Sequence, residues 1–512
     1  MYCISLFKFL LSNLQSRHWA VTSLTSLRHI LDESFNVAFV NRNENQLATV
    51  PTHVKQKLKN LHLALTDAAD DREASSIAAE FDKEFDLDNF STPRLIQPFA
   101  AKLIRWIKSF EMRVSSLSKN DCLVDVSQYL SSFQSRSVVC DMPTEIFSAK
   151  QPLHFRLKIF KYLPDVQSVS RGSWSCRRIF IRALNGKKYA FLIVPLGDAG
   201  PCLIHQLSRF VQLLHACNSI MSRNKECASR LLKFEVPSFV PISSNAILLS
   251  DDGCCLTFLD VLKEILKDQN MNPDDVIMRY FDKLTVHQSR TGRITDQNLK
   301  DIFKDILHTV VSKNSLSNYF GRLYPNAESY FTIRRQIGLN VGLINLAGHC
   351  FNLTPLKPNV LMFDKDHGSV STTFVRFSLN ETKPDSSEHE ICAFRVTPCL
   401  AEFLGLSLCG HMIPAMLAAA RALSQSYLHH YLRLLIFNDH HDFASICKQE
   451  NIESSVSDPV NVAENAVDAF INRLQGLSQL DNAENMPLLE AVSNYQNHDY
   501  LCKMDPAWHP WF

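Results

Sequence analysis

The sequence has almost no excess charge and no long apolar run. Its 512 residues carry 53 lysines and arginines against 52 aspartates and glutamates, a formal net charge of +1. So small a charge gives no overall field that would attract nucleic acid or an anionic membrane. No stretch reaches the roughly 18 apolar residues that span a bilayer. We therefore expect a soluble protein with no direct nucleic-acid partner and no membrane partner.

Paired-cysteine and metal motifs are also missing. The 15 cysteines include no CxxC pair, and an odd number cannot all be bridged within one chain, so we expect buried, reduced thiols. The doublets His429-His430 and His440-His441 could suggest a metal. Adjacent residues on a helix point about 100° apart, however, so each doublet offers at most one ligand per face. We expect no metal and no cofactor, and no GxSxG elbow marks a hydrolase.

Hydrophobic residues make up 46% of the chain, and its length predicts two to four domains. The first 14 residues lack a positive n-region and a cleavage site, so we expect a buried helix there rather than a signal peptide. Residues 98–117 predict an amphipathic helix, because apolar and basic residues alternate with a period near 3.6. Its apolar face holds Phe99, Leu103, Trp106, Ile107, Phe110 and Val114, opposite Lys102, Arg105 and Lys108.

Strand patterns begin after an irregular, proline-containing stretch at residues 120–163. The segment RRIFIRALNGKKYAFLIV (177–194) predicts a hairpin, with a type I′ turn at Asn185-Gly186. A helix at 204–216 and a strand pair, PSFVPI (237–242) and AILLS (246–250), follow it. These elements predict a small β-rich lobe with one helix.

The second half is mainly helical and carries one further hairpin within Asn352–Leu379. We expect helices within 258–308 and at 329–346, 462–480 and 486–492, and one long helix at 418–437. The hairpin's strands are predicted at 358–363 and 370–377. Asp364 and Asp366 would be exposed turn carboxylates between these strands. The chain closes on an aromatic, proline-broken tail, LCKMDPAWHPWF (501–512), which we expect to pack as a buried tail on the large lobe.

This order of elements resembles the C-terminal part of the phosphatidylinositol 3-kinase-related kinases, and most closely their pseudokinase branch. The segments LIRWIKSFE, NGKKYAFLIV, PNAESYFTIRRQ, AFRVTPCLAEFLG and LCKMDPAWHPWF carry the resemblance. It implies an α+β, bilobal protein-kinase-like fold between a helical FAT-type segment and a short helical FATC tail. The implied domains are the FAT end (1–118), a linker (119–163), the small lobe (164–250), the large lobe (251–479) and FATC (480–512).

In active members of that family a lysine ends the second strand of the small-lobe hairpin. The resemblance puts Val194 at this position, and Lys187 and Lys188 lie at the opposite end of the strand, roughly 20 Å away. The next helix of active members carries an Asp-Glu pair that positions the lysine. Here Leu207 and Ser208 take those places. The ion pair therefore cannot form.

The catalytic and metal-binding motifs differ as well. Against a family motif like GDRHLDN the chain has LTPLKPN, which puts Thr354 at the aspartate and Leu356 at the histidine. Only Asn359, a metal ligand in active relatives, is retained, and Arg376 replaces the metal-binding aspartate of DFG. A guanidinium there would repel Mg²⁺. A single Gly172 precedes the hairpin, too few glycines for a phosphate loop.

The resemblance thus implies a pseudokinase scaffold rather than an enzyme. It also implies a nuclear transcription co-activator, with subunits of SAGA- and Tip60-type histone acetyltransferase complexes as partners and activators bound by upstream regions. The tail residues Trp508, Pro510, Trp511 and Phe512 would serve structure or interaction. Two alternatives remain open: a diverged active serine/threonine kinase, and a module that binds a non-nucleotide anion or a peptide, with Arg376 as a contact.

Overall fold

The computed structural model describes the chain in segments. They are residues 19–43, 49–67, 72–86, 94–118, 122–135, 140–143, 155–171, 174–196, 200–244, 246–251, 254–291, 294–351, 353, 356–372, 394–424, 427–437, 459–478, 492 and 497–512. The chain divides into two compact units. Unit 1 comprises Met1–Ile204, Ser238–Gly253 and Ile277–Ile294, and unit 2 comprises His205–Pro237, Cys254–Val276 and Thr295–Phe512. The predicted helices at 1–14 and 486–492 lie outside the described residues, apart from residue 492.

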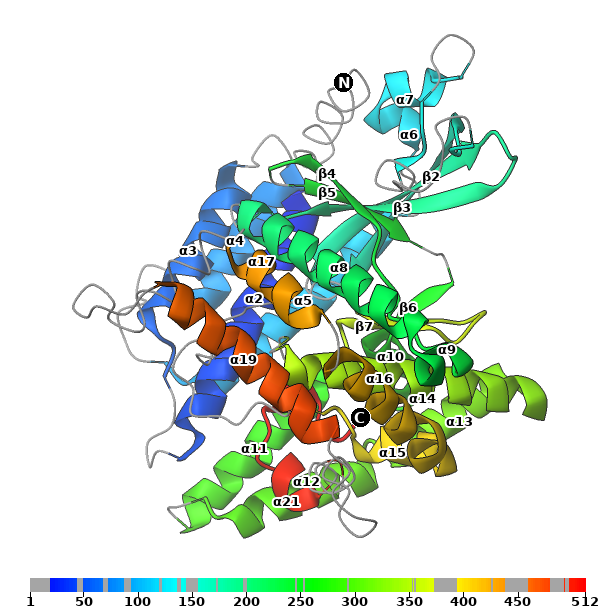
Figure 1. Ribbon diagram of the computed structural model, residues 1–512. Helices are drawn as coiled ribbons and strands as arrows, with labels where there is room; N and C mark the ends of the chain where they lie inside the picture. The colour runs from blue at the N-terminus through cyan, green and yellow to red at the C-terminus, as the bar shows by residue number, and fades with distance from the viewer. Residues whose placement is uncertain are drawn as a thin grey trace. The chain divides into compact units, whose positions relative to one another are not determined.

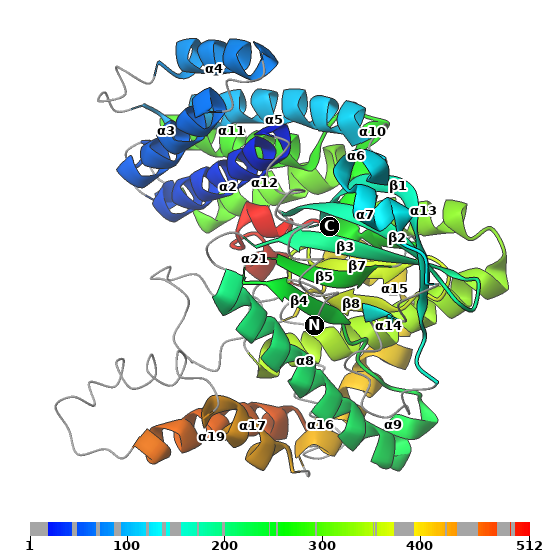
Figure 2. The same ribbon diagram turned by 90° about the horizontal axis from the view of Figure 1, so that it is seen from above.

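Unit 1 contains a group of packed helices. They are α2 (Trp19–Val40), α3 (Thr52–Asp67), α4 (Arg72–Phe85) and α5 (Ile96–Ser118), with most of α11 (Pro273–Thr291). Helix α2 packs against α3 and α5, which lie beside it in Figure 2. The α5 helix confirms the amphipathic helix predicted at 98–117. Its residues Leu103 and Phe110 are buried, and the Trp106 indole donates a hydrogen bond of 2.7 Å to the Glu84 carboxylate of α4.

Unit 1 also contains a five-stranded antiparallel sheet in the order β1-β2-β3-β5-β4 (Figure 1). Two short helices, α6 (Leu123–Val126) and α7 (Gln128–Ser132), contact β1. One face of the sheet is apolar and forms a core with Leu123, Leu130 and Met142. The strands are β1 (Ile159–Arg171), β2 (Trp174–Ala183), β3 (Lys188–Pro195), β4 (Phe239–Ser243) and β5 (Ala246–Asp251).

Sequence reasoning identified four of these strands and missed β1. Pro164 lies inside β1, and a proline is normally taken as a sign against a strand because it cannot donate to the ladder. Here the strand is at the sheet edge, and its pairing is irregular between Tyr162 and Val166. An edge position and an irregular register are the places where a strand tolerates proline.

The predicted type I′ turn between β2 and β3 is wrong. That turn needs positive φ at both central residues, but of the two only Gly186 has one, at +79°. The Gly186 amide donates to the Ala183 carbonyl at 3.0 Å, and the Ala183 amide donates to the Lys187 carbonyl at 3.0 Å. This pattern is a type I turn followed by a glycine in the left-handed region, a three-residue hairpin loop.

Unit 2 is built around α14 (Ala327–Cys350), whose residues from Ile337 to Ala347 are all buried. A helix that is buried on every side belongs at the centre of a helical unit. Antiparallel pairing joins β6 (Cys255–Thr257), β7 (Leu361–Asp364) and β8 (Val370–Thr372) into a small sheet. The other helices are most of α8 (Gly200–Arg223), α9 (Lys225–Ser229), α10 (Phe258–Lys267), α12 (Asp296–Thr309), α13 (Ser315–Leu323), α15 (Pro398–Leu404), η4 (Leu408–Met412, a π-helix), α16 (Ile413–Ser424), α17 (Leu428–Phe437), α19 (Pro459–Ser478), α21 (His498–Leu501) and η5 (Pro506–Trp508).

The single long helix predicted at 418–437 is wrong, because the chain forms two helices there, α16 and α17. Both pack against α19, and the three lie together in Figure 2. Two apolar stretches joined by a short polar break have the same helical period as one helix, so periodicity alone did not separate them. The prediction of a helix at 462–480 is confirmed by α19.

Among the described residues no single helix is long and apolar enough to cross a membrane, although α15 and the segment Leu408–Ser424 pass that test as a pair bent by 80°. Burial is described for eleven of the cysteine side chains. Burial raises the pKa of Cys176 and of Cys217 to about 12, so both are protonated at neutral pH. The thiols are buried in seven cases, and Cys409 is exposed.

Candidate functional site

Strand β3 carries a buried valine, Val194, at the position where the resemblance predicts the lysine of active relatives. Val194 has no exposed surface and pairs with Ile247 of β5. Lys188 lies at the other end of the strand, with its ammonium 3.6 Å from the centre of the Phe180 ring. Its cation–π contact holds it away from the position of Val194. No ammonium group is therefore available from β3 at that position.

An ion cluster lies on the same face of the sheet as Val194. Strand register places Arg178 beside Leu192 of β3, and Asp251 beside Ala190. Alternate residues of a strand share a face, so Val194, Arg178 and Asp251 face the same way. Arg178 donates to the Asp251 carboxylate at 2.6 Å, and Arg171 lies 3.5 Å from its other oxygen. Sequence reasoning missed this cluster, because its members come from three strands.

Helix α8 carries Leu207 and Ser208, at which the resemblance predicts the acidic pair of active relatives. Leu207 is buried, and Ser208 is half-buried. Neither side chain can pair with a lysine through charge. Their correspondence to the family's acidic pair stays a prediction.

The hairpin of β7 and β8 holds its two aspartates in different ways. Asp364 is 9% exposed, so the prediction of an exposed carboxylate is wrong for this residue and holds only for Asp366. One Asp364 oxygen accepts the Asp366 amide at 2.8 Å, and the other contacts the His367 ring at 2.7 Å. The carboxylate thus caps the turn. A Cβ added to Gly368 would approach the Ile333 backbone to 3.3 Å, which explains a glycine with φ of +69°.

The segment predicted to match the catalytic loop, residues 353–359, is described only in part. Leu356 is buried, and its carbonyl accepts a hydrogen bond from Arg395 at 3.0 Å. The Oδ1 atom of Asn359 is buried without a hydrogen-bond partner. Thr354 and Arg376 lie outside the described residues, so their predicted positions are untested.

The C-terminal tail packs onto Arg395, which sequence reasoning did not single out. Arg395 is 3% exposed, and its guanidinium donates to the carbonyls of Trp508 at 2.8 Å and His509 at 3.3 Å and to a main-chain oxygen of Phe512. Its own backbone is held by Asn345 of α14, through bonds of 3.0 and 3.3 Å. One buried cation therefore organises the irregular tail, 113 or more residues later in the chain.

The tail residues named from the sequence are all buried within unit 2, as predicted. Trp508, Pro510, Trp511 and Phe512 are enclosed, with Trp511 fully inaccessible. His509 has a left-handed backbone, with φ of +53°, and is 5% exposed. Burial, with Arg395 and Lys357 nearby, lowers the His509 pKa to about 3.

Among the described residues, no group of three or more histidine, cysteine, aspartate or glutamate side chains could hold a metal ion. His429 Nε2 lies 3.1 Å from the Asp468 carboxylate of α19, which makes it a helix–helix contact. His430 is exposed beside it, and the doublet at 440–441 lies outside the described residues.

Solved structures with a similar fold include the FAT and kinase domain of CtTel1, with a TM-score of 0.52 and 11% identity over 99% of this chain and 42% of that one. The complete CtTel1 dimer has a TM-score of 0.53 over 99% of this chain and 22% of that one, also at 11% identity. The predicted α+β kinase-like fold with a FAT-type segment is therefore confirmed. The chain has the FAT–kinase fold of the phosphatidylinositol 3-kinase-related kinases.

Comparison with proteins of similar sequence identifies the family to which the chain belongs within this fold class. The human transformation/transcription domain-associated protein is 30% identical over 461 residues, covering 86% of this chain and 12% of the relative. Transcription-associated protein 1 of Drosophila melanogaster is 28% identical over 96% of this chain and 14% of its own length. The SAGA complex/NuA4 acetyltransferase complex subunit TRA1 of Saccharomyces cerevisiae is 23% identical over 84% and 12%. The chain belongs to the transformation/transcription domain-associated protein family.

A scan of protein-family models finds no match. The chain spans 12–14% of the length of the three relatives just described. Activities and partners of the whole relatives can therefore be attributed to this chain only as proposals.

Proposed function

We propose that the chain is a non-catalytic, kinase-like scaffold within a transcription co-activator. The protein would be a nuclear subunit of histone acetyltransferase complexes of the SAGA and Tip60 types. The names of two yeast relatives support this, since both are described as SAGA and NuA4 acetyltransferase complex subunits. The domain division predicted above is part of the proposal. Because β1 begins at Ile159, the small lobe would start before residue 164.

Buried Val194 is the observation that carries the non-catalytic assignment. Phosphoryl transfer needs a cation on the nucleotide phosphates and an acidic group that positions it. The strand supplies no ammonium at Val194, and Leu207 supplies no carboxylate on α8. When several members of a catalytic set are missing together, little activity remains.

Calorimetric titration with ATP and Mg²⁺ at millimolar concentration tests this assignment. We expect no binding by the purified chain and a clear signal from an active member of the same kinase class. Magnesium-dependent ATP binding, with phosphate transfer that is lost in Asn359→Ala, would overturn the proposal.

The partner assignment needs a separate test on the full-length gene product. Affinity purification followed by mass spectrometry should recover acetyltransferase-complex subunits. Recovery of the protein without any of them would contradict the scaffold role, whatever the outcome with ATP.

One observation favours the alternative of a diverged active kinase. Asn359 matches the family's metal ligand, and its buried Oδ1 has no hydrogen-bond partner. An amide oxygen can accept a bond from a metal-bound water or coordinate Mg²⁺ directly. The Asn359→Ala variant in the ATP experiment decides between this role and a structural one.

A further inference from the structure

Unit 2 has a basic surface, built from α9, α14, η4 and α16, that takes no part in the kinase-like motifs. We call it the α9–η4 face and define it by Arg230, Arg334, Arg335, His411 and Arg421, with the exposed side chains Leu231, Phe331 and Leu406. All of these residues belong to one compact unit.

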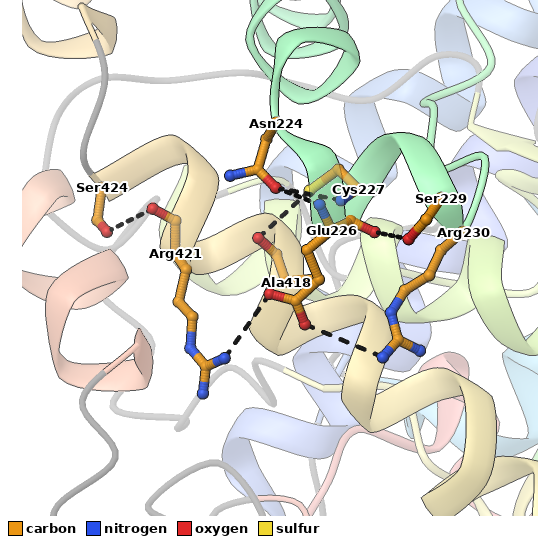
Figure 3. Close-up of polar contacts among 8 residues, drawn as sticks. All are labelled: Asn224, Glu226, Cys227, Ser229, Arg230, Ala418, Arg421 and Ser424. Atoms are coloured by element: carbon orange, nitrogen blue, oxygen red, sulfur yellow. Dashed lines mark hydrogen bonds and ion pairs between the residues drawn. The ribbon is translucent and has the colours of Figure 1, made fainter.

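Close contacts fix the elements of this face against one another. The Cys227 thiol of α9 donates to the Ala418 carbonyl of α16 at 3.3 Å (Figure 3). On the other side, a Cβ added to Gly342 of α14 would lie 2.9 Å from the Met412 carbonyl, so α14 and η4 are in direct contact. The Phe331 ring of α14 meets the His411 ring edge-on, with centroids 6.1 Å apart. The face is therefore preorganised.

The α9–η4 face carries more positive than negative charge. Glu226 is shared by two arginines, lying 3.9 Å from Arg230 and 3.7 Å from Arg421 (Figure 3). Arg334 and Arg335 have no carboxylate within 4 Å in the part of the chain that the structure describes. Such long, exposed ion pairs are weak, so the arginines remain available to another anion.

His411 lies among these arginines. Burial lowers its pKa, and the charges of Arg335, Arg334 and Arg230 lower it further. Its Nδ1 atom is buried without a hydrogen-bond partner. The positive charges of these three arginines therefore converge on His411, although the arginines come from two different helices.

Large apolar side chains are exposed beside these charges. Leu406 is 90% exposed and follows Gly405, while Leu231 is 82% exposed and follows Arg230. Leu231 also has a left-handed backbone, with φ of +57°, a conformation that is unfavourable for a leucine. Phe331 is 49% exposed. Exposed leucines and an aromatic ring next to arginines are typical of a protein-binding surface.

We propose that the α9–η4 face docks a segment of a partner protein in which acidic residues alternate with large apolar ones. The arginines would pair with the partner's carboxylates, and Leu231, Leu406 and Phe331 would contact its apolar side chains. Nucleic acid would satisfy the arginines but would leave the two leucines in water. This docking role does not depend on whether the chain transfers phosphate.

Fluorescence anisotropy with the purified full chain tests the proposal. The probe is a labelled 18-residue peptide in which glutamate and aspartate alternate with leucine, and the expected binding weakens as salt rises. The double variant R334E/R335E should lower affinity about tenfold or more, since it converts attraction to repulsion at two positions. The double variant L231G/L406S should lower it several-fold.

Matched controls separate this face from general electrostatics. K313E/R322E makes the same charge change at two exposed side chains of unit 2, 66% and 74% accessible, and should change affinity less than about twofold. Three results would overturn the proposal: equal binding of a peptide with serine in place of leucine, equal loss in the control variant, or displacement of the probe by a single-stranded DNA 18-mer at equal concentration. Dimerisation of the chain through this face, abolished in R334E/R335E, would overturn it as well.

Discussion

Arg395 and Trp508 are joined twice, although 113 residues separate them in the chain. The Arg395 guanidinium donates to the Trp508 carbonyl at 2.8 Å, and its central carbon lies 4.4 Å from the centre of the Trp508 ring. The guanidinium has five donors in a fixed plane, which suits an irregular segment whose carbonyls have no partners in a helix or sheet. The segment that precedes α15 therefore holds residues 508–512 in place within unit 2.

Replacing Arg395 with methionine should release this tail. The change leaves several buried carbonyls without a donor, and we expect a loss of about 3 kcal/mol or more in the free energy of unfolding. Urea unfolding measures the loss, and hydrogen exchange should show it concentrated in residues 497–512. Arg322→Met is the control, since its ion pair with Asp268 is about 75% exposed and should contribute under about 1 kcal/mol. Equal losses in the two variants would contradict the conclusion that Arg395 holds the tail in place.

Trp511→Ala tests how far the buried tail contributes to stability. Trp511 is inaccessible to solvent, and removing a buried tryptophan costs about 3–5 kcal/mol. Tyr427→Ala removes an aromatic side chain that is 79% exposed, and should cost less than about 0.5 kcal/mol. Thermal unfolding of both variants checks this. A Trp511→Ala protein as stable as the wild type would mean that the tail does not pack as described.

Local patterns in the sequence predicted those parts of the fold that local chemistry determines. The helix at 98–117 followed from the spacing of residues such as Leu103 and Phe110, which are buried on α5. The burial of Trp508 and Trp511 followed from their aromatic character. Where pairing partners are distant, the pattern was insufficient, as at β1, where Pro164 hid an edge strand.

The contacts of Arg395 with the C-terminal tail, and the ion cluster at Asp251, could not be predicted from the sequence for the same reason. Nothing next to Arg395 in the sequence indicates that its donors meet carbonyls more than 100 residues away. Asp251 is likewise paired with Arg178, 73 residues earlier, across three strands. Periodicity describes which face a residue occupies, whereas these contacts depend on how separate elements are placed.

Asp364→Ala separates a turn carboxylate from a metal ligand. The variant loses the bond to the Asp366 amide and the contact with His367, so we expect a loss of about 1–2 kcal/mol. Because the carboxylate bonds only within the turn, the loss of stability should be the same with and without 10 mM Mg²⁺. Thermal unfolding under both conditions measures it. Asp366→Ala, at an exposed position, should change stability by less than about 0.5 kcal/mol. Magnesium protection that is present in the wild type and absent in Asp364→Ala would instead indicate a metal site.

Two histidines with a lowered pKa should make the fold sensitive to acid. The His509 pKa is lowered to about 3 and the His349 pKa to about 4, both mainly by burial. An unfolded histidine has a pKa near 6.5. Below that pH the unfolded chain binds protons that the folded chain does not, so stability is complete above about pH 6.5 and falls on acidification. Each histidine should contribute a slope of about 1.4 kcal/mol per pH unit, down to its folded pKa.

His509→Asn isolates one of these contributions. Asparagine tolerates the left-handed backbone at this position and carries no titrating group, so part of the acid sensitivity should disappear. Urea unfolding at pH 7, 6 and 5 should show a slope smaller than that of the wild type by about 1.4 kcal/mol per unit below pH 6. An unchanged slope in His509→Asn would mean that His509 is protonated in the folded chain, and its burial beside Arg395 would then have to be rejected.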